Sequence, residues 1–161
     1  MKHVSFGTMP CPVARSLEHV GEWWSMLILR DALHGYKRFD EFEQSLGIAP
    51  GILARRLKTL VEAGMLERRQ YTSKPPRYEY LATDRCRDFG TVLHSLLAFG
   101  NRHFSPEGRS VVIVDAQTGV EAEPVMIDSR SGRPLSFPRF QWAAGPAADA
   151  EVRRRYAKVS G

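Results

Sequence analysis

One helix-length segment separates apolar from basic side chains around its circumference. Residues 50–64, PGILARRLKTLVEAG, begin at a proline, which a first helical turn tolerates, and end at a glycine, which is typical of a helix end. At about 3.6 residues per turn the leucines share one face. The opposite face carries Gly51, Arg55, Lys58 and Thr59. The segment must therefore bury one face against a core and offer a basic, small-featured face to a partner.

Three shorter helices are predicted before this segment. Apolar residues recur at spacings of three and four within residues 13–20, 22–35 and 38–47, which is the periodicity of an amphipathic helix. Gly47 ends the third helix, and Ile48 is expected to fill the turn that follows as an apolar plug. Two helices joined by such a turn predict a helix-turn-helix.

A hairpin and a long helix are predicted after it. Residues 65–71 and 77–82 alternate as strands, and residues 72–77, TSKPPR, connect them as a basic tip. Thr83 is a suitable N-cap for a helix over residues 84–103. The apolar stripe of this helix is longer than the small helices and hairpin need, so we interpret the excess as a dimer seam.

The positive charge of the chain lies in this middle region. The 161 residues carry a formal net charge of +5, and residues 49–77 hold seven bases and two acids, which accounts for all of it. A basic segment in a neutral body is typical of a polyanion-binding site. A solvated charged face is the alternative that composition alone leaves open.

The sequence also argues against several classes of protein. It has no uninterrupted apolar run of about 18 residues and no secretory leader, so we expect neither a membrane span nor export. Two cysteines are too few for a disulfide scaffold or a zinc cluster, and reduced thiols in the cytoplasm are expected. The histidines lack a catalytic constellation and no phosphate loop or metal spacing occurs, so we expect no enzyme, no cofactor and no metal.

Helix, tight turn, basic helix and basic hairpin form the layout of a winged helix-turn-helix, in which a helix enters the major groove of DNA. Residues 11–104 resemble the HxlR-type family of bacterial transcriptional regulators, relatives of the MarR group. The matching motifs are Cys11-Pro12, Gly21-x-x-Trp24, Arg38-Phe39, Gly47-Ile48, Leu53-x-x-Arg56-Leu57-x-x-Leu60 and Pro75-Pro76-x-x-x-Tyr80.

The resemblance implies an α+β fold: a winged helix-turn-helix with a long C-terminal dimerisation helix. It implies a homodimer on duplex DNA, on an inverted repeat, with residues 50–62 as recognition helix and residues 66–82 as wing. Repression is the more frequent outcome in this family. The candidate DNA-binding residues are Arg38, Pro50, Gly51, Arg55, Lys58, Thr59, Arg68, Arg69, Lys74 and Arg77.

Three details qualify this set. Strand alternation directs Arg68 and Arg69 to opposite sides, so only one of them can face DNA. Arg56 lies on the flank of the recognition helix and could equally be a structural ion-pair partner. Ala49 stands at the expected N-cap, where Ser or Thr would cap better by about 1 kcal/mol.

Cys11 is a possible redox sensor, because some members of the family sense oxidants, quinones or aldehydes through a cysteine at this position. It precedes Pro12, and the dipole of a helix N-terminus stabilises a thiolate. Other members keep such a cysteine without a sensing role. Cys86 is expected to be a small packing residue. Trp23 and Trp24 are expected in the core and dimer seam, with the wall of a small-molecule effector pocket as the alternative.

The sequence changes character after residue 104. A hydrophobic run followed by an Asp and a Gly four residues later occurs twice, at Asp115 and at Asp128, so we expect a three-stranded β-meander within an extension over residues 105–138. Residues 139–161 are expected to form a basic, flexible tail with a short helix. Packing against the dimer and effector binding are both open as roles for the extension.

The alternative to a DNA-binding regulator is a winged-helix interaction module that binds protein or RNA. It would not need Arg55 or Lys58 for binding to DNA, and it would show no preference for an inverted repeat.

Overall fold

The structure is a computed structural model that describes residues 9–157. These residues divide into two compact units, one of residues 13–93 and one of residues 9–12 with 94–157. Among the described residues no helix is long and apolar enough to cross a membrane.

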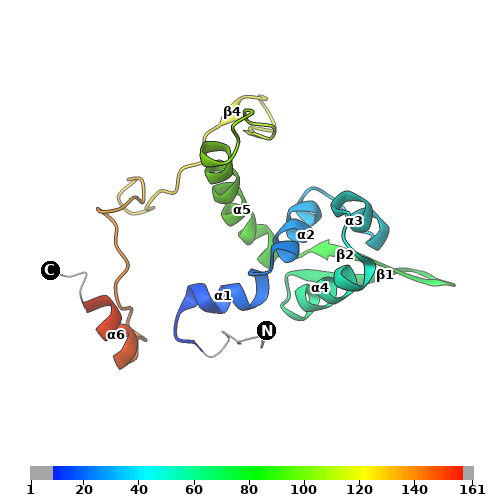
Figure 1. Ribbon diagram of the computed structural model, residues 1–161, viewed down its shortest axis with the longest axis horizontal. Coiled ribbons are helices and arrows are strands. Elements are labelled where there is room, and N and C mark those ends of the chain that lie inside the picture. Colours follow the sequence, from blue (N-terminus) through cyan, green and yellow to red (C-terminus); the bar gives the residue numbers. More distant parts are fainter. Residues whose placement is uncertain (1–8, 158–161) are drawn as a thin grey trace. The chain divides into compact units, whose positions relative to one another are not determined.

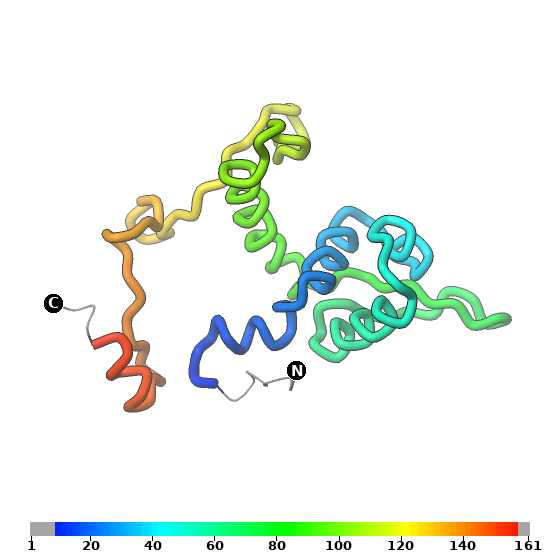
Figure 2. The backbone as a smooth tube through the Cα atoms, viewed as in Figure 1, coloured from blue at the N-terminus to red at the C-terminus, as the bar shows by residue number. Residues whose placement is uncertain are grey.

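The first unit is a helical cluster beside a β-hairpin (Figures 1 and 2). The hairpin projects beyond the helices, as a wing does. The helix and strand assignments predicted from the sequence are confirmed, with end points that differ by no more than two residues. The elements are α1 (Pro12–Val20), α2 (Trp23–Leu33), α3 (Phe39–Leu46), α4 (Pro50–Glu62), β1 (Leu66–Ser73), β2 (Pro76–Ala82) and α5 (Asp84–His103).

One apolar core holds these elements together. α2 and α4 each contribute three buried side chains to it, α1, α3 and α5 contribute one each, and β1 contributes its first residue, so the core depends on several elements together. Phe42 of α3 is fully buried near its centre. The buried apolar side chains are Val20, Ile28, Leu29, Ala32, Phe42, Ile48, Leu53, Leu57, Leu60, Met65, Leu66 and Cys86.

The turn between α3 and α4 fixes the entry into α4. Gly47 ends α3 in the left-handed conformation, with φ of 59°, and its N–H donates to the carbonyl of Glu43 at 2.9 Å. A residue with a Cβ is strained at this φ by about 1–2 kcal/mol. Ile48 follows and is only 3% exposed, which confirms the apolar plug. Ala49 is the N-cap of α4 and supplies no side-chain hydrogen bond, as expected.

The hairpin is longer than predicted and its tip is shorter. β1 and β2 pair antiparallel up to Ser73 and Pro76, so only Lys74 and Pro75 remain at the turn. The ladder can continue because a proline at the first residue of a strand needs no N–H donor there. The Thr72 hydroxyl donates to the Pro75 carbonyl at 3.2 Å and helps to close the turn.

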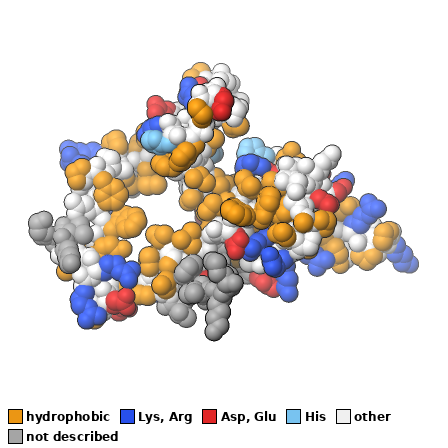
Figure 3. Space-filling model, viewed as in Figure 1, with side chains coloured by type: hydrophobic (Ala, Val, Ile, Leu, Met, Phe, Trp, Pro, Cys, Tyr) orange, Lys and Arg blue, Asp and Glu red, His pale blue; other side chains and the backbone are white. Residues whose placement is uncertain are grey.

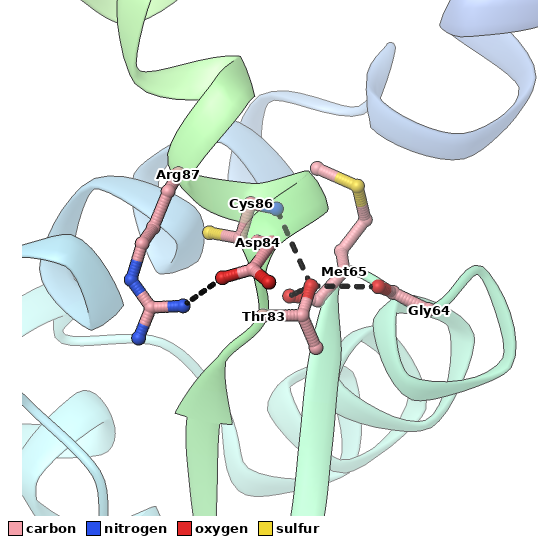
Figure 4. Close-up of polar contacts among 6 residues, drawn as sticks. All are labelled: Gly64, Met65, Thr83, Asp84, Cys86 and Arg87. Carbon is pink, nitrogen blue, oxygen red and sulfur yellow. Dashed lines mark hydrogen bonds and ion pairs between the residues drawn. The ribbon is translucent and has the colours of Figure 1, made fainter.

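Thr83 joins the hairpin to α5 and to the end of α4 (Figure 4). Its hydroxyl oxygen accepts the N–H of Cys86 at 3.3 Å, which confirms the predicted N-cap. The same hydroxyl lies 2.8 Å from the Gly64 carbonyl and 2.9 Å from the Met65 carbonyl and shares its proton between them. One side chain thus connects the starts of β1 and α5.

The second unit contains two separate hairpins instead of the expected three-stranded meander. β3 (Ile113–Val114) pairs with β4 (Glu121–Ala122), and a single bridge joins Ile127 to Pro134. The predicted sheet was wrong because each hairpin closes on its own turn after two residues or fewer. The short helix predicted in the tail is confirmed as α6 (Ala150–Tyr156); residues 158–161 lie outside the described part.

The repeated Asp-to-Gly pattern is the physical cause of this separation. The Asp115 carboxylate accepts the N–H of Thr118 and of Gln117, at 3.0 and 2.7 Å, and these bonds lower the pKa of Asp115. The Asp128 carboxylate accepts the Ser131 hydroxyl and the N–H of Arg130, which lowers the pKa of Asp128 in the same way. Each turn is therefore stabilised locally and needs no third strand.

Replacing Thr83 with Ala should lower the free energy of unfolding by about 1–2 kcal/mol, because the N-cap and the link to β1 are lost together. Urea denaturation followed by circular dichroism measures this. Thr83→Ser keeps the hydroxyl and should recover most of the loss; equal destabilisation by both changes would show that the methyl group, and not the hydroxyl, matters.

Candidate nucleic-acid interface

The two faces of α4 differ as the sequence predicted. Leu53, Leu57 and Leu60 are fully buried, while Arg55 and Lys58 are exposed. Because these residues share one rigid helix, burial of the leucines fixes the direction in which the two bases point. Pro50 and Gly51 are also exposed at the start of the helix, and Thr59 is half-buried.

The polar groups on this face differ in how much of their bonding capacity is already used. Arg55 has no acidic partner in the described part of the chain. Lys58 lies 3.8 Å from the Glu62 carboxylate, one turn along the same helix, which is a weak exposed pair. The Thr59 hydroxyl donates to the Arg55 carbonyl at 3.1 Å. Arg55 and Lys58 can therefore exchange solvent for an anionic partner at little cost.

Arg56 has a structural role. Its guanidinium lies 2.7 Å from the Glu22 carboxylate, at the start of α2, and its side chain is only 16% exposed. Its Nε is buried without a partner. This ion pair supports the interpretation of Arg56 as a structural residue. Arg56 therefore does not belong to the exposed face of α4 that holds Arg55.

The two adjacent arginines of β1 are engaged in different ways. Two guanidinium nitrogens of Arg69 lie 2.7 and 2.6 Å from the carboxylate of Glu79, its cross-strand neighbour. The guanidinium of Arg68 lies over the Tyr78 ring, with its carbon 3.5 Å from the ring centre. Stacking leaves the N–H groups at the edge of Arg68 free to donate. Of these two arginines, Arg69 is paired with an acidic side chain, whereas Arg68 has no acidic partner among the described residues.

A groove of about 480 Å³ lies between the start of α3 and the hairpin. Arg38 stacks over the ring of Tyr71 at 5.1 Å, and Arg77 and Tyr78 line the same groove. The exposed Lys74 stands beyond it at the hairpin turn. Figure 3 shows lysine and arginine side chains gathered over α4 and toward the end of the hairpin.

The stacked tyrosines were not predicted as part of this surface. Arg38 and Arg68 are predicted from the sequence, whereas Tyr71, over whose ring Arg38 stacks, is not. For Arg68 and Tyr78 the usable signal is that β1 carries arginines and β2 carries tyrosines, since neighbouring side chains on paired strands lie close enough to stack. Arg38 lies outside the hairpin, so no pattern along the strands links it to Tyr71.

The backbone around Arg38 is held in place from two sides. The Glu41 carboxylate accepts the N–H of Lys37 at 2.7 Å and of Arg38 at 2.8 Å, and these two bonds lower the pKa of Glu41. The N–H of Tyr80 donates to the Lys37 carbonyl at 2.7 Å. These contacts attach the hairpin to the helix-turn-helix.

The two cysteines have different environments. Cys86 is fully buried, and burial raises the pKa of its thiol to about 11. Cys11 is half-buried and directly precedes α1. Of the tryptophans, Trp24 packs partly against the core, whereas Trp23 is 75% exposed and does not belong to the core of the chain.

The second unit has a smaller groove, of about 200 Å³. It is lined by α5 and the β3–β4 hairpin, and ion pairs of Arg109 with Glu121 and of Arg102 with Glu123 cross it. Among the described residues no cluster of acidic, histidine and cysteine side chains could hold a metal ion.

A helix-turn-helix followed by a two-stranded wing defines the class: this is a winged helix-turn-helix protein of the α+β type. The chain belongs to the HxlR-like helix-turn-helix family, whose model matches residues 19–108. It is accordingly a transcriptional regulator with a helix-turn-helix domain.

Three similar proteins illustrate the relationship. An uncharacterised HTH-type transcriptional regulator of Mycobacterium tuberculosis is 35% identical over 141 residues, which are 87% of this chain and 89% of that protein. The structure of PA1374, classed as a transcription factor of Pseudomonas aeruginosa, is 49% identical with a TM-score of 0.65, over 90% of this chain and 99% of that one. The redox regulator HypR is 28% identical with a TM-score of 0.54, over 58% of this chain and 95% of that one.

Proposed function

We propose that the chain acts as a homodimeric, sequence-specific repressor that binds an inverted repeat of duplex DNA and performs no catalysis. α4 is its recognition helix, placed in the major groove, and the β1–β2 hairpin is its wing. The proposal places the protein in the cytoplasm with its DNA.

The observation that carries this proposal is the pair of exposed bases on the solvent face of α4, one without an acidic partner among the described residues and one in a weak exposed pair with Glu62. Arg55 and Lys58 stand on a helix whose buried leucines fix its rotation. Arginine and lysine are the residues that most often read guanine in the major groove. Pro50, Gly51 and Thr59 complete this face and allow close approach of the helix start.

The remaining candidate residues would hold the DNA backbone. Lys74 at the hairpin turn is a flexible point charge suited to a phosphate, and Arg38 and Arg77 would contact phosphates from the groove beside α3. We assign Arg68 to the DNA side of the wing, because Arg69 is neutralised by Glu79.

Dimerisation is assigned to α5. Val92, Leu96 and Phe99 lie at spacings of four and three along this helix and are each about half exposed, at 49%, 49% and 52%. Exposed apolar side chains in one stripe of a helix are typical of a helix–helix interface. A two-fold axis here would present two recognition helices to two half-sites.

Fluorescence anisotropy on DNA from the upstream region of its own gene, compared with a scrambled duplex at low and moderate salt, tests the proposal. Tight binding to the first duplex alone is expected. Binding that ignores sequence and disappears at the higher salt would contradict it and would favour the protein- or RNA-binding module.

Replacing Arg55 or Lys58 with Ala should weaken specific binding by about 1–3 kcal/mol and relax sequence preference, since a base contact is lost. Anisotropy on specific and random duplexes measures both effects. Arg87→Ala removes the same charge from an exposed residue of α5 that is paired with Asp84 and should change neither. Equal losses of affinity for both duplexes would show that α4 does not read the base sequence.

Replacing Lys74 with Ala should weaken binding to all duplexes alike, because a phosphate contact carries no sequence information. The slope of log affinity against log salt should fall by about one unit. An unchanged slope would show that the turn of the hairpin does not reach the DNA backbone. Glu67→Gln, which alters the charge at the other end of β1, serves as a comparison.

We also propose that Cys11, which is half-buried and directly precedes α1, is the redox-responsive residue. The similar structure of the redox regulator HypR supports this proposal. Treatment with a thiol-reactive quinone should release DNA from the wild type but not from Cys11→Ser. Cys86→Ser should respond like the wild type, because a thiol with a pKa of about 11 is ionised in about one molecule in ten thousand at neutral pH. Release from Cys11→Ser would contradict the assignment.

A further inference from the structure

The second unit holds many large apolar side chains but has no core. None of the described residues from 94 to 157 is buried. In a folded protein such side chains are normally covered, because exposed apolar area costs free energy in proportion to its size. The exposed ones after α5 are Phe104, Val111, Val112, Val114, Val120, Val125, Met126, Ile127, Leu135, Phe137 and Trp142.

These side chains are concentrated in residues 120–142, which we call the C-terminal arm. The arm is locally ordered: the N–H of Leu135 donates to the Met126 carbonyl at 2.8 Å, across the second hairpin. Phe137 and Trp142 then meet edge to face, with ring centres 6.3 Å apart. Even so, Phe137 remains 71% exposed and Trp142 61% exposed. The arm thus has a defined conformation that holds its apolar side chains toward solvent.

The charge of the arm points to the kind of partner. It contains three acids (Glu121, Glu123, Asp128) and three bases (Arg130, Arg133, Arg139), so its net charge is zero. A neutral apolar surface gains nothing from the field of DNA or of an acidic membrane. It is suited to a protein surface of similar composition, as in an interface between identical chains.

The size of the apolar surface fits such an interface. Seven large apolar side chains of the arm, each with roughly 100 Å² exposed, offer roughly 700 Å² per copy, which is close to the roughly 800 Å² that one partner contributes to a standard protein interface. The arm also follows in sequence from α5, whose stripe we assign to the dimer seam. The family model ends at residue 108, so the arm lies outside the region that the model describes.

We propose that the C-terminal arm packs against a second copy of this chain, so that the dimer interface includes residues 120–142 as well as α5. This inference rests on the dimer in the proposed function. It assigns the extension to dimer stability and not to effector binding.

The fluorescence of Trp142 tests this in the full chain. The emission of the wild type minus that of Trp142→Phe isolates Trp142 from Trp23 and Trp24. Acrylamide quenching of this difference should be weak at high protein concentration and at least severalfold stronger after dilution below the dimer dissociation constant. Strong quenching at every concentration would overturn the inference in favour of a foreign partner. Weak quenching at every concentration would overturn it in favour of packing within one chain.

Sedimentation equilibrium gives a second, independent measurement. Phe137→Ser in the full chain should raise the dimer dissociation constant at least tenfold, since a buried aromatic anchor is lost. Tyr71→Ser, which changes an exposed aromatic of the wing, is the matched control and should leave it unchanged. An unchanged constant in Phe137→Ser would overturn the inference.

The same samples separate this inference from the proposed function. A chain that dimerises through the arm but binds no specific DNA would refute the proposed repressor and leave the arm assignment intact. A chain that binds its operator as a dimer while Trp142 stays fully quenchable would refute the arm alone.

Discussion

The burial of three leucines on one face of α4 is the constraint on which the rest of the structure depends. Leu53, Leu57 and Leu60 lie in the core formed with α2 and α3, and each is fully buried. Rotating α4 by one residue would place Arg56 or Lys58 against this core, at the cost of burying an unpaired charge. The apolar side of the helix therefore determines the position of Arg55 on the solvent face, and no ion pair among the described residues holds its guanidinium there.

The wing depends on a different kind of constraint, the pairing of side chains across strands. Arg68 and Arg69 are adjacent and chemically identical, yet one stacks on Tyr78 and the other pairs with Glu79. Their difference arises because Glu79 lies directly opposite Arg69 in the antiparallel register. A cross-strand ion pair consumes the charge of Arg69, whereas stacking orients Arg68 and leaves its donors available.

The predictable features were those set by local sequence. The bounds of α4, the plug at Ile48 and the cap at Thr83 follow from periodicity, turn chemistry and capping, which act over a few residues. The partners of Arg68 and Arg69 depend on the register between β1 and β2. This register shifts at an irregularity between Gln70 and Thr72, and the pattern along either strand alone does not locate that irregularity. The expected meander failed for a related reason, because the strength of each local turn decides whether a third strand is needed.

The two surfaces of the chain are separated by charge as well as by sequence. The whole formal charge of +5 lies within residues 49–77, and the C-terminal arm is neutral. Attraction to a polyanion weakens as salt rises, while burial of apolar surface does not. With both properties in one mixed surface, DNA and a second protomer would compete for the same side chains. In the proposed dimer, this segregation would let the arm and α5 hold two copies together under conditions in which α4 and the wing release DNA, so that the dimer would persist between binding events.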